Sequence, residues 1–143
     1  MNNEKLKVEK VSWQDEKSNL RQIRTTVFVE EQKVPEELEW DEYDETCIHV
    51  LASINNEFVA TGRLLETGQI GRMAVLKSYR EQGVGSKILE KLLVIAESIG
   101  FKTVFLNSQV DAISFYNRFG FKEEGGVFDD AGIPHKRMTK QFK

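Results

Sequence analysis

With 143 residues, of which 40% are hydrophobic and 30% charged, the chain is long enough for one folded domain and too polar for a membrane protein. We therefore expect a single domain over residues 1–143, with no transmembrane run, no secretory signal and no membrane partner. The lone cysteine, Cys47, excludes an internal disulfide and favours a reducing compartment, so we expect a cytoplasmic location. A net charge of −3, with no basic stripe interleaved with aromatic residues, excludes a nucleic-acid partner.

Apolar residues at period 2 predict strands, and apolar residues at period 3.6 predict helices. In chain order we expect a strand at 5–11, a helix at 14–30 capped by Ser12 or Asp15, strands at 46–54, 58–65 and 69–76, a helix at 84–99, a strand at 103–106, a helix at 112–118 and a hairpin at 121–128 and 134–142. The short connections among the three middle strands permit only antiparallel hairpins. The fold class is therefore α/β, with one mixed, mostly antiparallel sheet of about seven strands and helices on both faces.

The charge is unevenly distributed. The segment from Glu30 to Glu45 contains nine acidic residues and one lysine, so it carries −8 and the rest of the chain +5. A mildly basic body suits a polyanionic cofactor. The acidic segment (residues 30–45) either attracts a cationic acceptor or is an ordinary solvated surface.

The loop Arg80-Glu81-Gln82-Gly83-Val84-Gly85-Ser86 lies between a predicted strand and the most amphipathic predicted helix. Its two glycines let backbone N–H groups approach a ligand, and a helix N-terminus favours an anion such as a diphosphate. A P-loop would need Gly-Lys-Ser/Thr here, and a dinucleotide-binding fingerprint would need a third glycine where Ile88 stands. Neither of these two motifs fits.

Two motifs carry a family resemblance: Arg80-x-x-Gly83-x-Gly85, and a second one made of Ala112, Phe115, Tyr116, Gly120 and Phe121. With this spacing, and with the element order above, the chain resembles the GNAT superfamily of N-acetyltransferases. The segments Val-Phe-Val-Glu-Glu-Gln at 27–32 and Gly-Ile-Pro-His at 132–135 also resemble its ElaA-like branch. The resemblance implies that the parallel strands on either side of the glycine loop splay apart to admit the cofactor.

That cofactor would be acetyl-CoA, with coenzyme A as a product. The resemblance implies that its pantetheine arm pairs with the strand backbone and that the loop amides hold its diphosphate. The implied cofactor-binding residues are Met73, Ala74, Val75, Arg80, Gln82, Gly83, Val84, Gly85, Ser86, Asn107, Gln109, Phe115 and Tyr116.

The implied reaction is direct attack by a primary amine in a ternary complex. Tyr116 is the candidate general acid, because a phenol with a pKa near ~10 stays protonated at neutral pH yet can donate to a departing thiolate. The alternatives left open are a non-catalytic acetyl-CoA sensor and an acyltransferase that uses another acyl donor.

Candidates for acceptor binding are Phe28, Glu31, His49, Arg72 and His135. Many relatives carry a carboxylate on the strand before the loop, where this chain has Arg72, Met73 and Ala74. The base would then be Glu31, His49 or His135, or no base would be needed. Arg72, like Arg63, either binds an anionic part of the acceptor or pairs with the acidic segment. A small-molecule amine is the expected partner of a monomer or homodimer.

No metal is predicted. The acids Asp41, Asp44 and Glu45 lack the spacing and the glycine of a calcium loop. Cys47 and His49 are too few for a zinc site.

Overall fold

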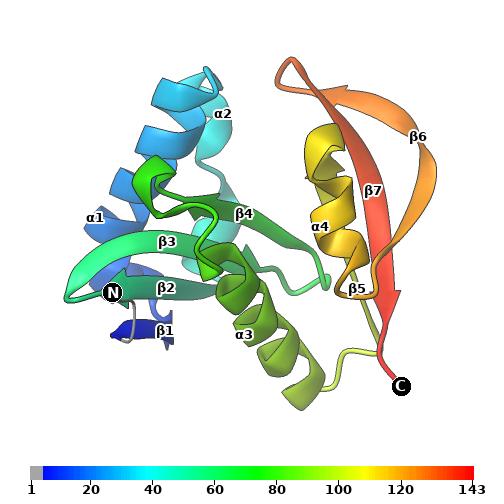
Figure 1. Ribbon diagram of the computed structural model, residues 1–143, viewed down its shortest axis with the longest axis horizontal. Helices are drawn as coiled ribbons and strands as arrows, with labels where there is room; N and C mark the ends of the chain where they lie inside the picture. The colour runs from blue at the N-terminus through cyan, green and yellow to red at the C-terminus, as the bar shows by residue number, and fades with distance from the viewer. Residues whose placement is uncertain (1–4) are drawn as a thin grey trace.

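The computed structural model describes residues 5–143, which form seven strands and a set of helical segments (Figure 1). The strands are β1 (Leu6–Val11), β2 (Ile48–Ile54), β3 (Glu57–Leu64), β4 (Ile70–Val75), β5 (Thr103–Gln109), β6 (Lys122–Asp130) and β7 (Ile133–Gln141). The helical segments are α1 (Trp13–Arg24), η1 (Thr25–Glu31), α2 (Glu36–Glu39), η2 (Glu42–Glu45), η3 (Lys77–Tyr79), α3 (Val84–Ser98), η4 (Val110–Ala112) and α4 (Ile113–Asn117). The predicted order of the main strands and helices is confirmed.

The expectation of one sheet with a parallel splayed pair is wrong. The strands form two antiparallel sheets, β1-β2-β3-β4 and β5-β7-β6. Between residues 5 and 143, β4 and β5 are linked only by an isolated parallel bridge from Gln69 to Phe105, where the Phe105 N–H donates to the Gly68 carbonyl at 3.1 Å. Beyond this bridge, side chains such as those of Met73, Leu106 and Tyr116 line the space between the two strands. No ladder joins the two strands there, so they are not held at the roughly 4.8 Å spacing of neighbouring strands in a sheet.

The two faces of the first sheet are covered by different helices, as predicted. Side chains of β2 alternate, so that Val50 and Ala52 join the cluster under α3, while Leu51 joins Leu20 and Ile23 of α1. Helix α3 packs closely on β3: a Cβ built on Gly62 would lie 2.9 Å from Ile88 Cγ2. A glycine is therefore needed at this contact.

The predicted helix at 14–30 is really two segments. Helix α1 begins at the cap formed by Ser12, whose Oγ accepts from the Asp15 N–H at 3.0 Å. From Thr25 to Glu31 it continues as a π-helix, a wider turn that is frequent at functional sites. Among the described residues, no helix combines the length and the apolar character that a membrane crossing requires.

Candidate active site

The gap between β4 and β5 opens on a cavity of about 300 Å³. Its walls come from the stretch between η1 and α2, from β4, from β5 with α4, and from the β6–β7 hairpin. Figure 1 shows these segments facing one another across the gap. Elements far apart in the sequence therefore enclose one site.

The edge of β4 that faces the gap has a free backbone N–H group. The Leu76 N–H donates to the Val59 carbonyl on β3 at 2.9 Å. Successive N–H groups of an extended strand point to opposite edges, so the Val75 N–H points away from β3 and into the gap. Nearby, Arg72 and Met73 together oppose Gly62, which makes a bulge with Arg72 at φ 49°.

The glycine loop forms the N-terminus of α3, as predicted. Gly83 is the N-cap at φ 82°, and no side chain caps the helix. The Lys87 N–H donates to the Gly83 carbonyl at 3.2 Å, so the N–H groups of Val84, Gly85 and Ser86 precede the first intrahelical donor. A Cβ on Gly83 would meet no atom within 4 Å, and a Cβ on Gly85 would lie 3.8 Å from Val75 and from Phe115. The loop thus borders open space beside the free edge of β4.

The Arg80 guanidinium, which precedes the glycine loop, is already bound by other residues of the protein. Its two terminal nitrogens donate to the Glu31 carboxylate at 2.6 and 2.7 Å, and its Nε donates to the Val75 carbonyl at 2.9 Å. The hydrogen bond from Arg80 lowers the pKa of Glu31. Gln32, the next residue, accepts a hydrogen bond from the Gln109 amide at 2.9 Å. The end of η1 therefore bridges both walls of the gap.

Tyr116 lies on the cavity wall contributed by α4. Its ring packs edge-on against Phe115 and Phe121, with centroid distances of 5.0 and 6.0 Å. Within residues 5–143 the one hydrogen-bond partner of its hydroxyl is Met73 Sδ at 3.7 Å. Burial raises the pKa of Tyr116 to about 12. The hydroxyl is therefore protonated at neutral pH and available to a ligand.

The structure separates the two histidines. His135 lines the cavity, and its Nδ1 lies 2.7 Å from the Ile133 carbonyl. Because a carbonyl only accepts, Nδ1 carries the proton and Nε2 of the neutral ring has a free lone pair. His49 is buried on the face of β2 that α1 covers, where it stacks on Trp13 at 5.0 Å, and it does not line the cavity.

Some of the other predicted contact residues line the cavity and some do not. Phe28, Asn107 and Gln109 line the cavity, but Glu31 does not. Asn107 has an exposed side chain, whereas the Gln109 amide is engaged by Gln32. Of the three base candidates, His135 alone reaches the cavity.

Part of the acidic segment is buried in a network of ion pairs, which we call the arginine network: Arg24, Arg63 and Arg72 with Glu39, Asp41 and Asp44. Arg24 donates to Glu39 at 2.7 Å and to Asp44 at 2.8 Å. Arg63 donates to Asp41 and Asp44, each at 2.8 Å. Arg72 Nε lies 3.1 Å from Glu39 Oε2.

The arginine network shows that these acids are not a solvated surface. Burial raises the pKa of Glu39, in spite of its two arginine partners. Burial alone would also raise the pKa of Asp44, but the hydrogen bonds and charges of Arg24 and Arg63 outweigh it and lower that pKa. Arg63 and Arg72 therefore both pair with the acidic segment, one of the two roles that the sequence left open for them.

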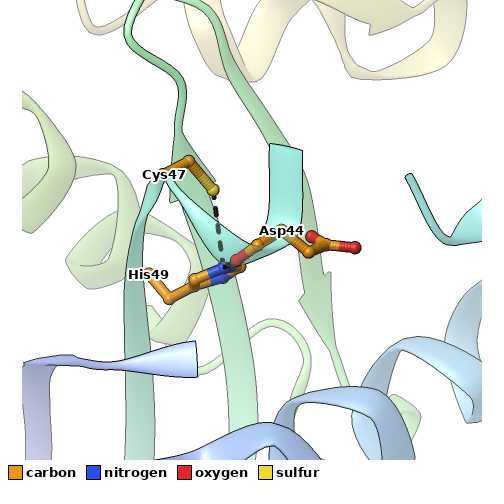
Figure 2. Close-up of side chains that lie close together, drawn as sticks. All are labelled: Asp44, Cys47 and His49. Atoms are coloured by element: carbon orange, nitrogen blue, oxygen red, sulfur yellow. Dashed lines mark hydrogen bonds between the residues drawn. The ribbon is translucent and has the colours of Figure 1, made fainter. Parts of the chain in front are cut away.

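Asp44, Cys47 and His49 lie close together, as Figure 2 shows, with their potential ligand atoms within 4.8 Å of one another. Each is already engaged. His49 Nε2 lies 2.8 Å from the Asp44 carbonyl and 3.4 Å from Cys47 Sγ, while the Asp44 carboxylate binds two arginines. Burial raises the pKa of Cys47 to about 11, so the sulfur is a thiol and a poor ligand. This donor set does not fit a metal ion.

Comparison with known proteins assigns the chain to a family. A profile described as "Acetyltransferase (GNAT) domain" matches residues 9–142. Protein ElaA of Escherichia coli (strain K12) is 32% identical over 130 residues, which cover 85% of each chain. The uncharacterized N-acetyltransferase YjcF of Bacillus subtilis (strain 168) is 38% identical over 122 residues, which cover 82% of this chain and 87% of YjcF.

Solved structures agree. The crystal structure of Escherichia coli ElaA has a TM-score of 0.86 at 30% identity and covers 94% of this chain and 99% of its own. An acyl-CoA N-acyltransferase from Pseudomonas aeruginosa has a TM-score of 0.85 at 32% identity, with the same coverage. The architecture is thus that of the acyl-CoA N-acyltransferases. The chain belongs to the GNAT acetyltransferase family, and its predicted similarity to ElaA is confirmed.

Some residues of the cavity were missed from the sequence. Glu39 and Gln32 line it. Glu39 belongs to no recognisable motif, and Gln32 ends the ElaA-like segment at 27–32 but was not among the predicted contact residues. The one available signal was Arg24, which lies on the apolar side of α1 with Leu20 and Ile23. A charged residue in that position indicates buried acidic partners.

Proposed function

We propose that this protein is an acetyl-CoA-dependent N-acetyltransferase that moves the acetyl group directly to the primary amine of a small molecule. The observation that carries the proposal is the free edge of β4, which lies between the uncapped N-terminus of α3 and the cavity that holds Tyr116 and His135. The proposal is supported by membership of an acetyltransferase family and by the similarity to a Pseudomonas aeruginosa protein described as an acyl-CoA N-acyltransferase.

The residues present fit the cofactor. The N–H groups of Val84, Gly85 and Ser86 would hold its diphosphate, where orphan donors and the helix dipole favour an anion. The Val75 N–H would pair with the pantetheine arm or with the acyl oxygen. When bound, acetyl-CoA supplies an activated acetyl group and a thiolate leaving group.

The side chains of the cavity have matching roles. His135 Nε2 accepts a proton from the amine as its nitrogen forms a bond to the acetyl carbon and the carbon–sulfur bond breaks. The Tyr116 hydroxyl donates to the departing sulfur. The products are an N-acetylated amine and the free thiol of coenzyme A. Holding both reactants in one site supplies much of the rate, so no covalent enzyme intermediate is needed.

Thiol release from acetyl-CoA in the presence of a panel of primary amines tests the proposal. The expected result is release that depends on both the enzyme and the amine. Tight binding of acetyl-CoA with no amine-dependent release would instead support a sensor, the reading favoured by the absent strand carboxylate. Release from longer acyl-CoA esters in preference to acetyl-CoA would identify another acyl donor.

The substitution Gly83→Val is expected to abolish binding of coenzyme A while the domain stays folded. A new Cβ meets no protein atom within 4 Å, so it would project into the space proposed for the diphosphate. Gly100→Val is the matched control, because Gly100 also has positive φ and open surroundings but ends the helix that Gly83 begins. Calorimetry should detect binding to the control only, and equal affinity in both variants would contradict the loop's role.

His135→Gln is expected to lower kcat/KM by about 100-fold near neutral pH, where an alkyl amine is protonated and needs a base. As the pH approaches about 10, the amine loses its proton to solvent, and the difference in kcat/KM between the variant and the wild type should shrink. A pH profile of kcat/KM for both proteins measures this. A deficit that stays constant over the whole range would show that His135 only shapes the cavity.

A further inference from the structure

The cavity does not share the strong negative charge of the acidic segment beside it. The three arginines of the arginine network offset its three acids, so these six residues have no net charge. Besides these and the Tyr116 phenol, the titratable residues of the lining are Asp130 and His135, both from the β6–β7 hairpin. The acids of the arginine network therefore give the cavity no excess negative charge from this side.

On this wall one cationic group has unused hydrogen-bond donors. Arg72 Nε and Nη2 donate to the Glu39 carbonyl at 3.3 and 3.1 Å, and Nη2 also reaches Asp41 at 3.4 Å. Its Nη1 has no acceptor within residues 5–143. That nitrogen is also not sealed from solvent, unlike Arg63 Nε, and 28% of the Arg72 side chain is exposed.

The bulge in β4 fixes this group in place. Arg72 has φ 49°, a conformation that only a few side chains adopt readily, and its guanidinium is held from one side by Glu39 and Asp41. A guanidinium fixed in this way loses little freedom when it binds an anion, and its hydrogen bonds to a carboxylate are charge-assisted. Arg72 itself lines the cavity, so a ligand bound there lies beside the guanidinium that carries the free Nη1.

We propose that the acceptor is an amino carboxylate, such as an α-amino acid, whose carboxylate is bound by Arg72. Its amine would lie toward the hairpin wall, where His135 Nε2 accepts a proton and the Asp130 carboxylate favours the ammonium form on entry. The apolar lining residues Phe28, Val34, Leu38 and Ile133 would contact an apolar side chain of the acceptor. The reaction would convert the amino acid and acetyl-CoA into the N-acetyl amino acid and coenzyme A. This inference rests on the proposed function.

Matched pairs of acceptors test it. Leucine and phenylalanine are compared with isopentylamine and 2-phenylethylamine, which lack only the carboxylate, and thiol release from acetyl-CoA gives kcat/KM for each. The wild-type protein should prefer the amino acid of each pair by about 10- to 100-fold, the contribution of a hydrogen bond to a charged group. This comparison requires no variant, so it holds even if a substitution impairs folding.

The substitution Arg72→Asn tests the residue, because asparagine tolerates positive φ. The preference, taken as the ratio of kcat/KM for the amino acid to kcat/KM for its matched amine in the same variant, should fall to near unity through a higher KM for the amino acid. Arg21→Gln, which removes a cation outside the cavity, should keep the wild-type preference.

A wild-type enzyme that acetylates both members of a pair equally, or an Arg72→Asn variant that keeps the preference, would overturn this inference and leave the acetyltransferase intact. An absence of release with all four acceptors and the amine panel would reject the proposed function itself.

Discussion

Replacing Arg24 by leucine is expected to lower the free energy of unfolding by about 3–5 kcal/mol, the effect of removing one partner from a buried ion pair. Arg24 is 1% exposed and donates to Glu39 and Asp44, which are 3% and 2% exposed. Without it, Glu39 loses its closest cation and Asp44 loses one of its two arginines, so Arg63 and Arg72 offset these carboxylates only partly. Because a domain of this size is stable by only about 5–15 kcal/mol, much of its stability would be lost.

The matched control is Arg21→Leu. Arg21 lies on the same helix, and its guanidinium is 4.5 Å from the Trp40 ring that Arg24 also approaches at 4.9 Å. Among the described residues Arg21 has no acidic partner, so its replacement should change stability by less than about 1 kcal/mol. Urea unfolding near neutral pH measures both. Equal effects would show that packing on Trp40, and not the ion pairs, explains the role of Arg24.

Much of the fold follows from local patterns. The hairpins at 46–76 were predictable because short turns such as Asn55-Asn56, both at positive φ, allow only antiparallel neighbours. The division into two sheets was not, because it depends on how far β4 and β5 pair along their length, which no local pattern determines. The π-helix from Thr25 to Glu31 could not be predicted either, because its residues have the apolar spacing of an ordinary α-helix.

The sequence likewise predicted those parts of the candidate site that belong to contiguous motifs and not those that only the fold brings together. The glycine loop and Tyr116 belong to contiguous motifs, so the sequence was enough to single them out. The sequence could not show which of the two histidines is the better candidate base, because that depends on which face of its strand borders the cavity. The arginine network joins Arg24 to Asp44 across 20 residues, and no spacing rule indicates such a pair.

Replacing Tyr116 by phenylalanine is expected to lower kcat by about 10²- to 10⁴-fold, the usual contribution of a general acid, with little change in stability. The hydroxyl has a weak partner in Met73 Sδ at 3.7 Å, so its removal leaves no strong donor or acceptor unpaired. Tyr79→Phe is the control, because the Tyr79 hydroxyl donates to Glu57 at 3.0 Å and lies outside the cavity. Thiol release and urea unfolding are measured for both variants.

The pH dependence sharpens this test. Burial raises the pKa of Tyr116 to about 12. The hydroxyl keeps its proton up to that range, so its ionisation should produce no falling limb in the wild-type rate below about pH 10, the pKa of an unperturbed phenol. A falling limb near neutral pH that is absent in Tyr116→Phe would show that the Tyr116 proton is needed for the reaction but is lost there, which would contradict the raised pKa and not the acid role. An unchanged rate in Tyr116→Phe at every pH would remove the hydroxyl from the reaction, and protonation of the departing sulfur would then fall to solvent.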